Sequence, residues 1–139
     1  MDGAVRIVQM IRIAMMVSVA LYVIVGEELA HASQVAPDST LYFGITLVAV
    51  VLVAMIVVMR RWFVVPAEAA LAKQVEDRTA LGRWQMGYII TYALSEAVAL
   101  FGLVLRMIGF SLSQVATFYV VGLILMMFFG PRRPSHEIR

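Results

Sequence analysis

Glu96 is the residue of this 139-residue chain whose type and surroundings most clearly suggest chemistry. It lies near the middle of a mostly apolar run, residues 84–107, which is long enough to cross a membrane. A charged side chain at that depth costs about 2.5–3.5 kcal/mol, so such residues are rare and face a partner or the inside of a helix bundle. The carboxyl group either binds a proton or a cation, or stays neutral and hydrogen-bonds across helices as a packing element.

The partners of Glu96 are predicted from depth and helical phase. Tyr92 precedes it by one helical turn and shares its face. If the chain folds back after the third apolar run, Tyr119 reaches a similar depth and Thr117 lies less than a turn beyond it. Ser18 lies within about one turn of the midplane of the first apolar run. We expect Glu96 to be buried, protonated at neutral pH and hydrogen-bonded to the hydroxyl group of Tyr119 or Tyr92.

A second cluster, Glu27, Glu28 and His31, lies at the end of the first apolar run. If the helix continues, the spacing of three and four residues places a carboxylate and an imidazole on one side, where they are candidate ligands for a metal. A di-iron site needs a second such motif, and the sequence has none. The alternative is a solvated helix end whose acidic residues help to exclude this loop from the cytoplasm. We expect no bound cofactor or metal.

Composition places the chain in a membrane. Hydrophobic residues make up 63% and charged residues 14% of it, whereas soluble domains are about 45–50% apolar and about 25% charged. The absence of cysteine excludes disulfides and thiolate chemistry. The sequence holds no hydrolase, P-loop, dinucleotide-binding or zinc-protease motif, so we expect no enzyme activity. The basic residues act as topology signals, and nucleic acid is not an expected partner.

The elements that would position these residues are helices. The fold class is an all-α polytopic membrane protein, a single membrane domain with four transmembrane helices and a short interfacial helix. The predicted spans are residues 5–25, 41–59, 84–107 and 112–129, joined by a loop at 60–83 and followed by a basic tail at 130–139. Helix-forming residues at 67–76 predict a helix along the membrane plane. Residues 37–40 are expected to form a turn that also caps the second span, and residues 109–111 to form a tight turn.

Charge predicts the orientation of these helices. Of the 11 Lys and Arg residues, all but Arg106 fall on one side of the predicted membrane. Since basic residues accumulate in cytoplasmic loops, we expect a multi-pass protein of the inner (plasma) membrane with both termini in the cytoplasm. Residues 1–32 also fit a cleaved signal peptide, which is the competing interpretation. Five arginines are candidates for lipid headgroup contact: Arg60, Arg61, Arg106, Arg132 and Arg133. Arg106 has two alternatives, pairing with Glu27 or Glu28 and lining an outer vestibule for anions.

Residues 93–105, ALSEAVALFGLVL, resemble the carboxylate helix of rotary ATP synthase c (proteolipid) subunits. The resemblance implies that Glu96 holds the translocated proton or Na⁺, because the glutamate of that helix does so in the family. The chain departs from the family in carrying a fourth apolar run after this helix and in having a single glycine, Gly44, in the run before it. A rotor ring is therefore not expected.

Two functions remain from the sequence. The first is proton- or cation-linked transport through the midplane carboxylate of Glu96, in a homo-oligomer if four helices are too few to enclose a pathway. The second is a non-catalytic membrane subunit or scaffold of a larger assembly, in which Glu96 is an interhelical hydrogen-bonding residue. Ala93 and Ala97 offer such a scaffold a small-residue surface for packing against a partner.

Overall fold

The structure is a computed structural model that describes residues 2–30, 38–74 and 77–131. Every regular element in these ranges is helical, which confirms the predicted all-α class. The elements are α1 (Asp2–Ala30), α2 (Ser39–Met59), a π-helical turn (Arg60–Val64), α3 (Val65–Lys73), α4 (Arg78–Ile108) and α5 (Leu112–Phe128).

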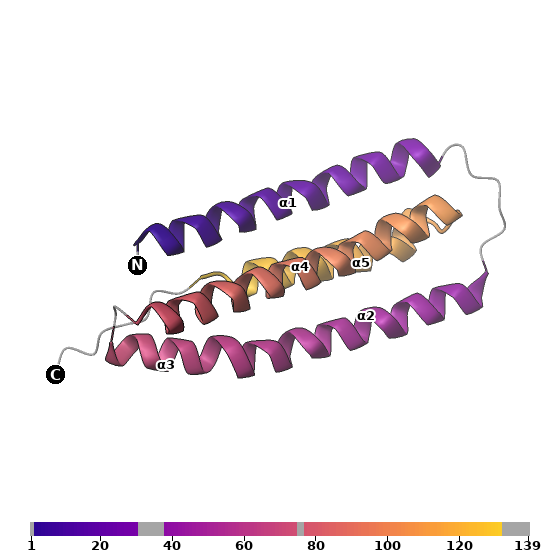
Figure 1. Ribbon diagram of the computed structural model, residues 1–139. Helices are drawn as coiled ribbons and strands as arrows, with labels where there is room; N and C mark the ends of the chain where they lie inside the picture. The colour runs from indigo at the N-terminus through magenta and orange to yellow at the C-terminus, as the bar shows by residue number, and fades with distance from the viewer. Residues whose placement is uncertain (1, 31–37, 75–76, 132–139) are drawn as a thin grey trace.

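α4 is the central helix and packs against α1, α2, α3 and α5. α1 and α2 lie on opposite sides of α4, as Figure 1 shows, and α1 also packs against α5. α1 begins and α5 ends at the same end of the bundle (Figure 1). We call this the basic end, because Arg12 and Arg60 both lie beside the last residues after α5. The opposite end, where α4 turns into α5, is called the hairpin end.

Local sequence signals explain where the helices begin and end. The carboxylate of Asp38 accepts a hydrogen bond from the Thr40 amide at 2.8 Å, so Asp38 caps α2 as the sequence predicts. Asp77 caps α4 in the same way. Gly109 ends α4 with a φ of 113°, a left-handed conformation that glycine adopts without strain. Ser111 then opens α5 with a capping box, which makes α4 and α5 a tight antiparallel pair.

The helix predicted along the membrane plane is a correction. Residues 65–73 are helical, but α3 continues the line of α2 through the π-helical turn, as Figure 1 shows, and residues 39–73 form one apolar helix. Pro66 is the physical reason, because it has no N–H group and its ring crowds the carbonyl four residues earlier. The π-helical turn relieves this crowding by bonding the Val65 amide to the Arg60 carbonyl, five residues back. Pro66 is thus accommodated by a π-bulge within one continuous helix and does not start a new helix.

Small residues bring α4 and α5 close together. A Cβ atom at Gly122 would lie 2.9 Å from the Ser95 carbonyl oxygen and 3.0 Å from the Ala99 Cβ atom. A Cβ atom at Gly102 would lie 3.1 Å from the Phe118 Cβ atom. Ser95 and Ala99 are fully buried in this contact. The α4–α5 pair is therefore closely packed, and it holds the face of α4 next to Glu96 in a fixed position.

The lengths and compositions of these helices fit a small multi-pass membrane protein. Three helices are long and apolar enough to cross a membrane: Gly3–Ala30, Ser39–Lys73 and Arg78–Ile108. α5 is also apolar but has 17 residues, about 25 Å of helix. α2 packs least, since Ala49 and Ile56 are its buried residues and its other apolar side chains stay wholly or partly exposed. An exposed apolar surface of this kind is the surface that lipid covers.

Candidate functional site

Glu96 makes its hydrogen bond with Tyr22. The Tyr22 hydroxyl group donates to Glu96 Oε1 over 2.6 Å, which joins the middle of α4 to α1. Both side chains are half-buried, and the neighbours of Glu96 on its outer side, Ala93 and Leu100, are exposed. Glu96 therefore lies at the rim of the α1–α4 interface, where a packed face of α4 meets a face open to the surroundings.

The predicted partners of Glu96, Tyr92 and Tyr119, are wrong. The Tyr92 hydroxyl group donates to the Phe129 carbonyl oxygen at 3.1 Å, near the basic end. The Tyr119 hydroxyl group is buried against Gly26 and has no hydrogen-bond partner among the described residues. The reason is that side chains on a helix lean toward its N-terminus. Tyr92 thus leans away from Glu96 along α4, and Tyr119, on the antiparallel α5, leans toward the hairpin end.

The two other residues expected near Glu96, Ser18 and Thr117, lie on different surfaces of the bundle. The Ser18 hydroxyl group donates to the Ala14 carbonyl oxygen at 3.2 Å, and Ser18 lies one helical turn before Tyr22. Thr117 instead lines an apolar groove between α2, α4 and α5, together with Thr46 of α2. Ser18 is therefore next to the Tyr22–Glu96 contact, whereas Thr117 belongs to a different surface.

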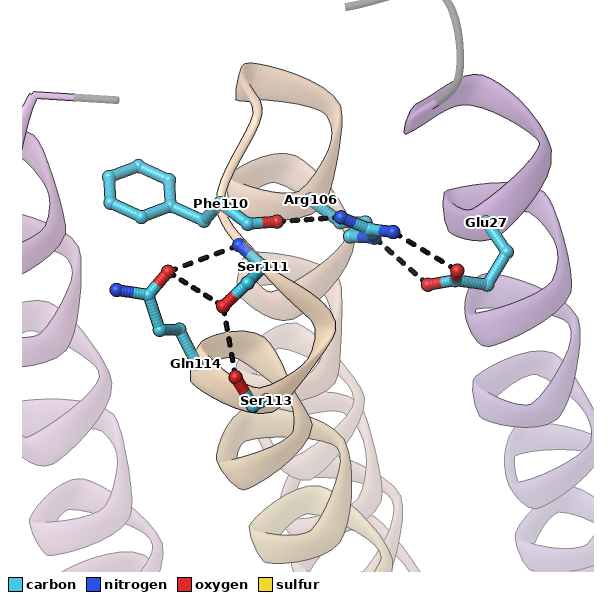
Figure 2. A network of polar contacts seen from close by, with 6 residues as sticks. All are labelled: Glu27, Arg106, Phe110, Ser111, Ser113 and Gln114. Atoms are coloured by element: carbon cyan, nitrogen blue, oxygen red, sulfur yellow. Dashed lines mark hydrogen bonds and ion pairs between the residues drawn. The ribbon is translucent and has the colours of Figure 1, made fainter. Parts of the chain in front are cut away.

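Arg106 forms the strongest polar contact of the hairpin end, which Figure 2 shows. Its Nε and Nη2 atoms donate to the two carboxylate oxygens of Glu27 at 2.9 and 3.0 Å, and its Nη1 atom donates to the Phe110 carbonyl oxygen at 2.9 Å. The Arg106 side chain is 17% exposed and that of Glu27 36% exposed. A two-pronged pair of this kind is stronger than a single charged hydrogen bond. It ties the end of α1 to the turn between α4 and α5.

This pairing settles how the structure uses several predicted residues. Arg106 pairs with Glu27, the alternative to headgroup contact considered above. Glu27 is thereby committed to an arginine, Glu28 is exposed, and His31 lies outside the described residues. Residues 2–30, 38–74 and 77–131 contain no group of three His, Cys, Asp or Glu side chains placed to hold a metal ion. Because the candidate metal cluster includes His31, which lies outside these ranges, it stays a prediction.

Basic and aromatic side chains gather at the basic end, which sequence reasoning missed. The Arg60 guanidinium group lies 5.0 Å from the ring centre of Tyr88 and 4.3 Å from that of Phe129, both at cation–π distance. The Tyr88 hydroxyl group donates to Glu68 Oε1 at 3.1 Å. Arg61, the next residue, is exposed, and Arg132 and Arg133 lie outside the described residues. Arg60 is thus half-buried against aromatic rings, whereas Arg61 is exposed.

Two side-chain contacts join α1 to α4: the Tyr22–Glu96 bond and, nearer the hairpin end, the Arg106–Glu27 pair. The Tyr88–Glu68 bond instead joins α4 to α3 near the basic end. The α2 side of α4 differs, because a groove of about 380 Å³ there is lined almost wholly by aliphatic and aromatic side chains. The molecule therefore has a polar interface and an apolar groove on different sides of one central helix.

Comparison with known proteins adds no relative. No family model matches the chain, and neither the curated proteins nor the solved structures searched give a match. The likeness of residues 93–105 to the carboxylate helix of proteolipid subunits thus has no family match behind it. What the fold and composition establish is a small, all-helical membrane protein.

Proposed function

We propose that this membrane protein takes up and releases a proton at Glu96, within a transport process across the bilayer. The observation that carries the proposal is the 2.6 Å hydrogen bond between Tyr22 and Glu96 at the half-open rim of the α1–α4 interface. The phenol holds the Glu96 carboxyl group in place, and the half-open rim leaves that group accessible from the surroundings of the bundle.

A proton suits this site better than a metal cation. Hard cations such as Ca²⁺ take six to eight oxygen ligands. Around Glu96 the hydrogen-bonding partner is one phenol, and the next hydroxyl group along α1, that of Ser18, already donates to a backbone carbonyl oxygen. A proton needs a single carboxyl oxygen. The choice between proton and cation thus follows from the number of oxygen atoms that the described residues supply.

A liposome experiment tests the proposal. The purified chain is reconstituted with a pH-sensitive dye inside the vesicles, and proton entry is followed after a pH jump with valinomycin and K⁺ to balance charge. We expect measurable flux for the native chain, loss of flux in Glu96→Gln and reduced flux in Tyr22→Phe. Thr117→Val is the matched control, because Thr117 lines the apolar groove away from Glu96. Equal flux in the native chain and Glu96→Gln would overturn the proposal.

A second candidate function, a non-catalytic membrane subunit or scaffold, is favoured by the apolar groove beside α2. Its lining includes Ala49, Val53, Val57, Val98, Thr117 and Val121. Ala93 and Ala97 add small residues on the other, open side of α4. Because the native sequence has no cysteine, single cysteines at Val50 and Ala93 give clean disulfide crosslinks. Crosslinked homodimers in membranes at either position would support self-association, and their absence at both would exclude these two surfaces for it.

We also propose that the basic end faces the cytoplasm. The inference follows from the sequence, in which all Lys and Arg residues but Arg106 fall on one side of the predicted membrane. Alkaline phosphatase fusions at residues 34, 72 and 139 test it. We expect activity at residue 34 alone, and activity at residue 72 or 139 would contradict the assignment.

A further inference from the structure

Two arginines from distant parts of the chain meet at the end of α5. The Arg60 guanidinium group lies 4.3 Å from the ring centre of Phe129. The Nη1 atom of Arg12 would lie 2.7 Å from a Cβ atom placed on Gly130, the next residue. Two consecutive residues of one chain segment are therefore each touched by one guanidinium group, although the arginines come from α1 and from the π-helical turn after α2.

Among the residues that the structure describes, no carboxylate neutralises the positive charge of this pair. Within the described ranges neither Arg12 nor Arg60 forms an ion pair, and Glu68, the carboxylate of this cluster, accepts instead from Tyr88. Two buried nitrogens, Arg12 Nε and Arg60 Nη1, have no hydrogen-bond partner there. A buried donor without an acceptor costs about 1–3 kcal/mol, and more when it is charged. The cluster therefore has unused capacity for an acceptor that bears negative charge.

The depth of the cluster identifies the source of that acceptor. The helices carry no charged residue from 13 to 26, from 41 to 59 or from 112 to 130, so three uncharged stretches all stop at the level of Arg12, Arg60 and Gly130. This common level is the boundary between hydrocarbon and headgroups. Phosphate groups of lipids lie at that boundary, and arginine is the side chain best suited to binding them.

We propose that Arg12 and Arg60 together form a binding site for the phosphate group of an anionic phospholipid at the basic end. Both side chains are half-buried, and the rings of Tyr88 and Phe129 lie against the guanidinium group of Arg60. The site differs from general attraction between a basic surface and lipid. Arg6 and Arg61 are exposed neighbours of the same charge and lie outside it.

Lipid retention in native mass spectrometry tests the site. The full chain is purified in detergent, stripped of lipid and titrated with phosphatidylglycerol or phosphatidylcholine. We expect phosphatidylglycerol to bind the native chain at least ten-fold more tightly than it binds Arg12→Gln or Arg60→Gln. The matched controls, Arg6→Gln and Arg61→Gln, should stay within two-fold of the native chain. Equal losses in all four variants would mean that general surface charge binds the lipid, and would overturn the proposal.

Two further arms keep the test decisive. Gly130→Ala changes no charge but places a Cβ atom where the Arg12 guanidinium group lies, so we expect weaker phosphatidylglycerol binding in a variant that stays folded by circular dichroism. Inorganic phosphate at millimolar concentration should not displace the lipid. Full displacement would assign the site to a soluble phosphate and overturn the lipid assignment. A native chain without preference for phosphatidylglycerol over phosphatidylcholine would also overturn it, even if no variant folds.

Discussion

Tyr22 and Glu96 join α1 to α4 by one short hydrogen bond, 2.6 Å from the phenol oxygen to the carboxylate. The two helices run in the same direction from the basic end (Figure 1). The chain therefore returns to that end through α2 and α3 before α4 begins. The Arg106–Glu27 pair joins the same two helices nearer the hairpin end. In hydrocarbon, where water offers no competing partner, such a bond also fixes the rotation of one helix against the other.

The first prediction concerns the stability of this contact. Tyr22→Phe and Glu96→Leu should each lower the free energy of unfolding by about 0.6–2 kcal/mol, since each leaves the other side chain without its partner. The double variant should lose less than the sum, because both changes remove the same bond. Glu96→Gln should stay within about 0.5 kcal/mol of the native chain, because an amide oxygen also accepts from the phenol.

The measurement is reversible unfolding in mixed micelles for the native chain and the four variants. Additive losses in the double variant would show that Tyr22 and Glu96 do not interact in the membrane. The separate behaviour of Glu96→Gln matters for function: unchanged stability together with lost proton flux distinguishes a working carboxyl group from a packing one.

The second prediction concerns the link at the hairpin end. Arg106→Gln should destabilise the chain by about 1–3 kcal/mol, because it removes a charged partner of Glu27 and the donor to Phe110. Glu27→Gln should cost less, since the Glu27 side chain is 36% exposed and Arg106 keeps its bond to the Phe110 carbonyl group. Thermal unfolding in detergent checks the order of these losses. Glu28→Gln is the exposed control and should be silent; a loss equal to that of Glu27→Gln would contradict the pairing.

The third prediction concerns close packing between α4 and α5. Gly122→Val should destabilise the chain by more than about 1 kcal/mol, because the added atoms would meet the Ser95 backbone and Ala99 and force the helices apart. Gly44→Val on α2 is the matched control, since a Cβ atom at Gly44 meets nothing within 4 Å. Unfolding of both variants in the same micelles measures the difference. Equal effects at the two glycines would contradict the close α4–α5 approach.

The sequence predicted the helical class and the helix caps because these depend on local patterns. An apolar run, a cap residue such as Asp38 and a helix-ending glycine such as Gly109 each determine the structure of only a few residues around them. The helices, the cap and the turn that they predict are present in the structure. The direction of α3 depends instead on how a helix absorbs a proline. Proline is common at the first position of a helix, but the π-helical turn before Pro66 keeps residues 39–73 in one helix. Local pattern alone does not distinguish the two outcomes.

The candidate site was predicted only in its central residue. Glu96 stands out by its type and depth, but its partner depends on helix order and on the lean of each tyrosine side chain. The sequence does indicate Tyr22 as a partner, since Tyr22 lies one helical turn after Ser18, which is predicted to lie near the midplane. The Arg12–Arg60 cluster had no comparable signal, because residues 48 positions apart meet only through the packing of three chain segments.

The last prediction tests the continuous α2–α3 helix, on which the placement of Arg60 depends. Spin labels at two exposed positions, Val50 and Ala72, flank the π-helical turn. A continuous helix places their backbones about 33 Å apart at 1.5 Å per residue, whereas a right-angled bend at residue 60, as an in-plane helix would require, gives about 23 Å. Electron–electron double resonance in nanodiscs measures this distance, and a single population near the longer value is expected. A main population near the shorter value would contradict the continuous helix and would remove the support that α3 gives to the Arg60 cluster. Pro66→Ala should leave the longer distance unchanged, because a residue with an N–H group lets an ordinary α-helix run through the same segment.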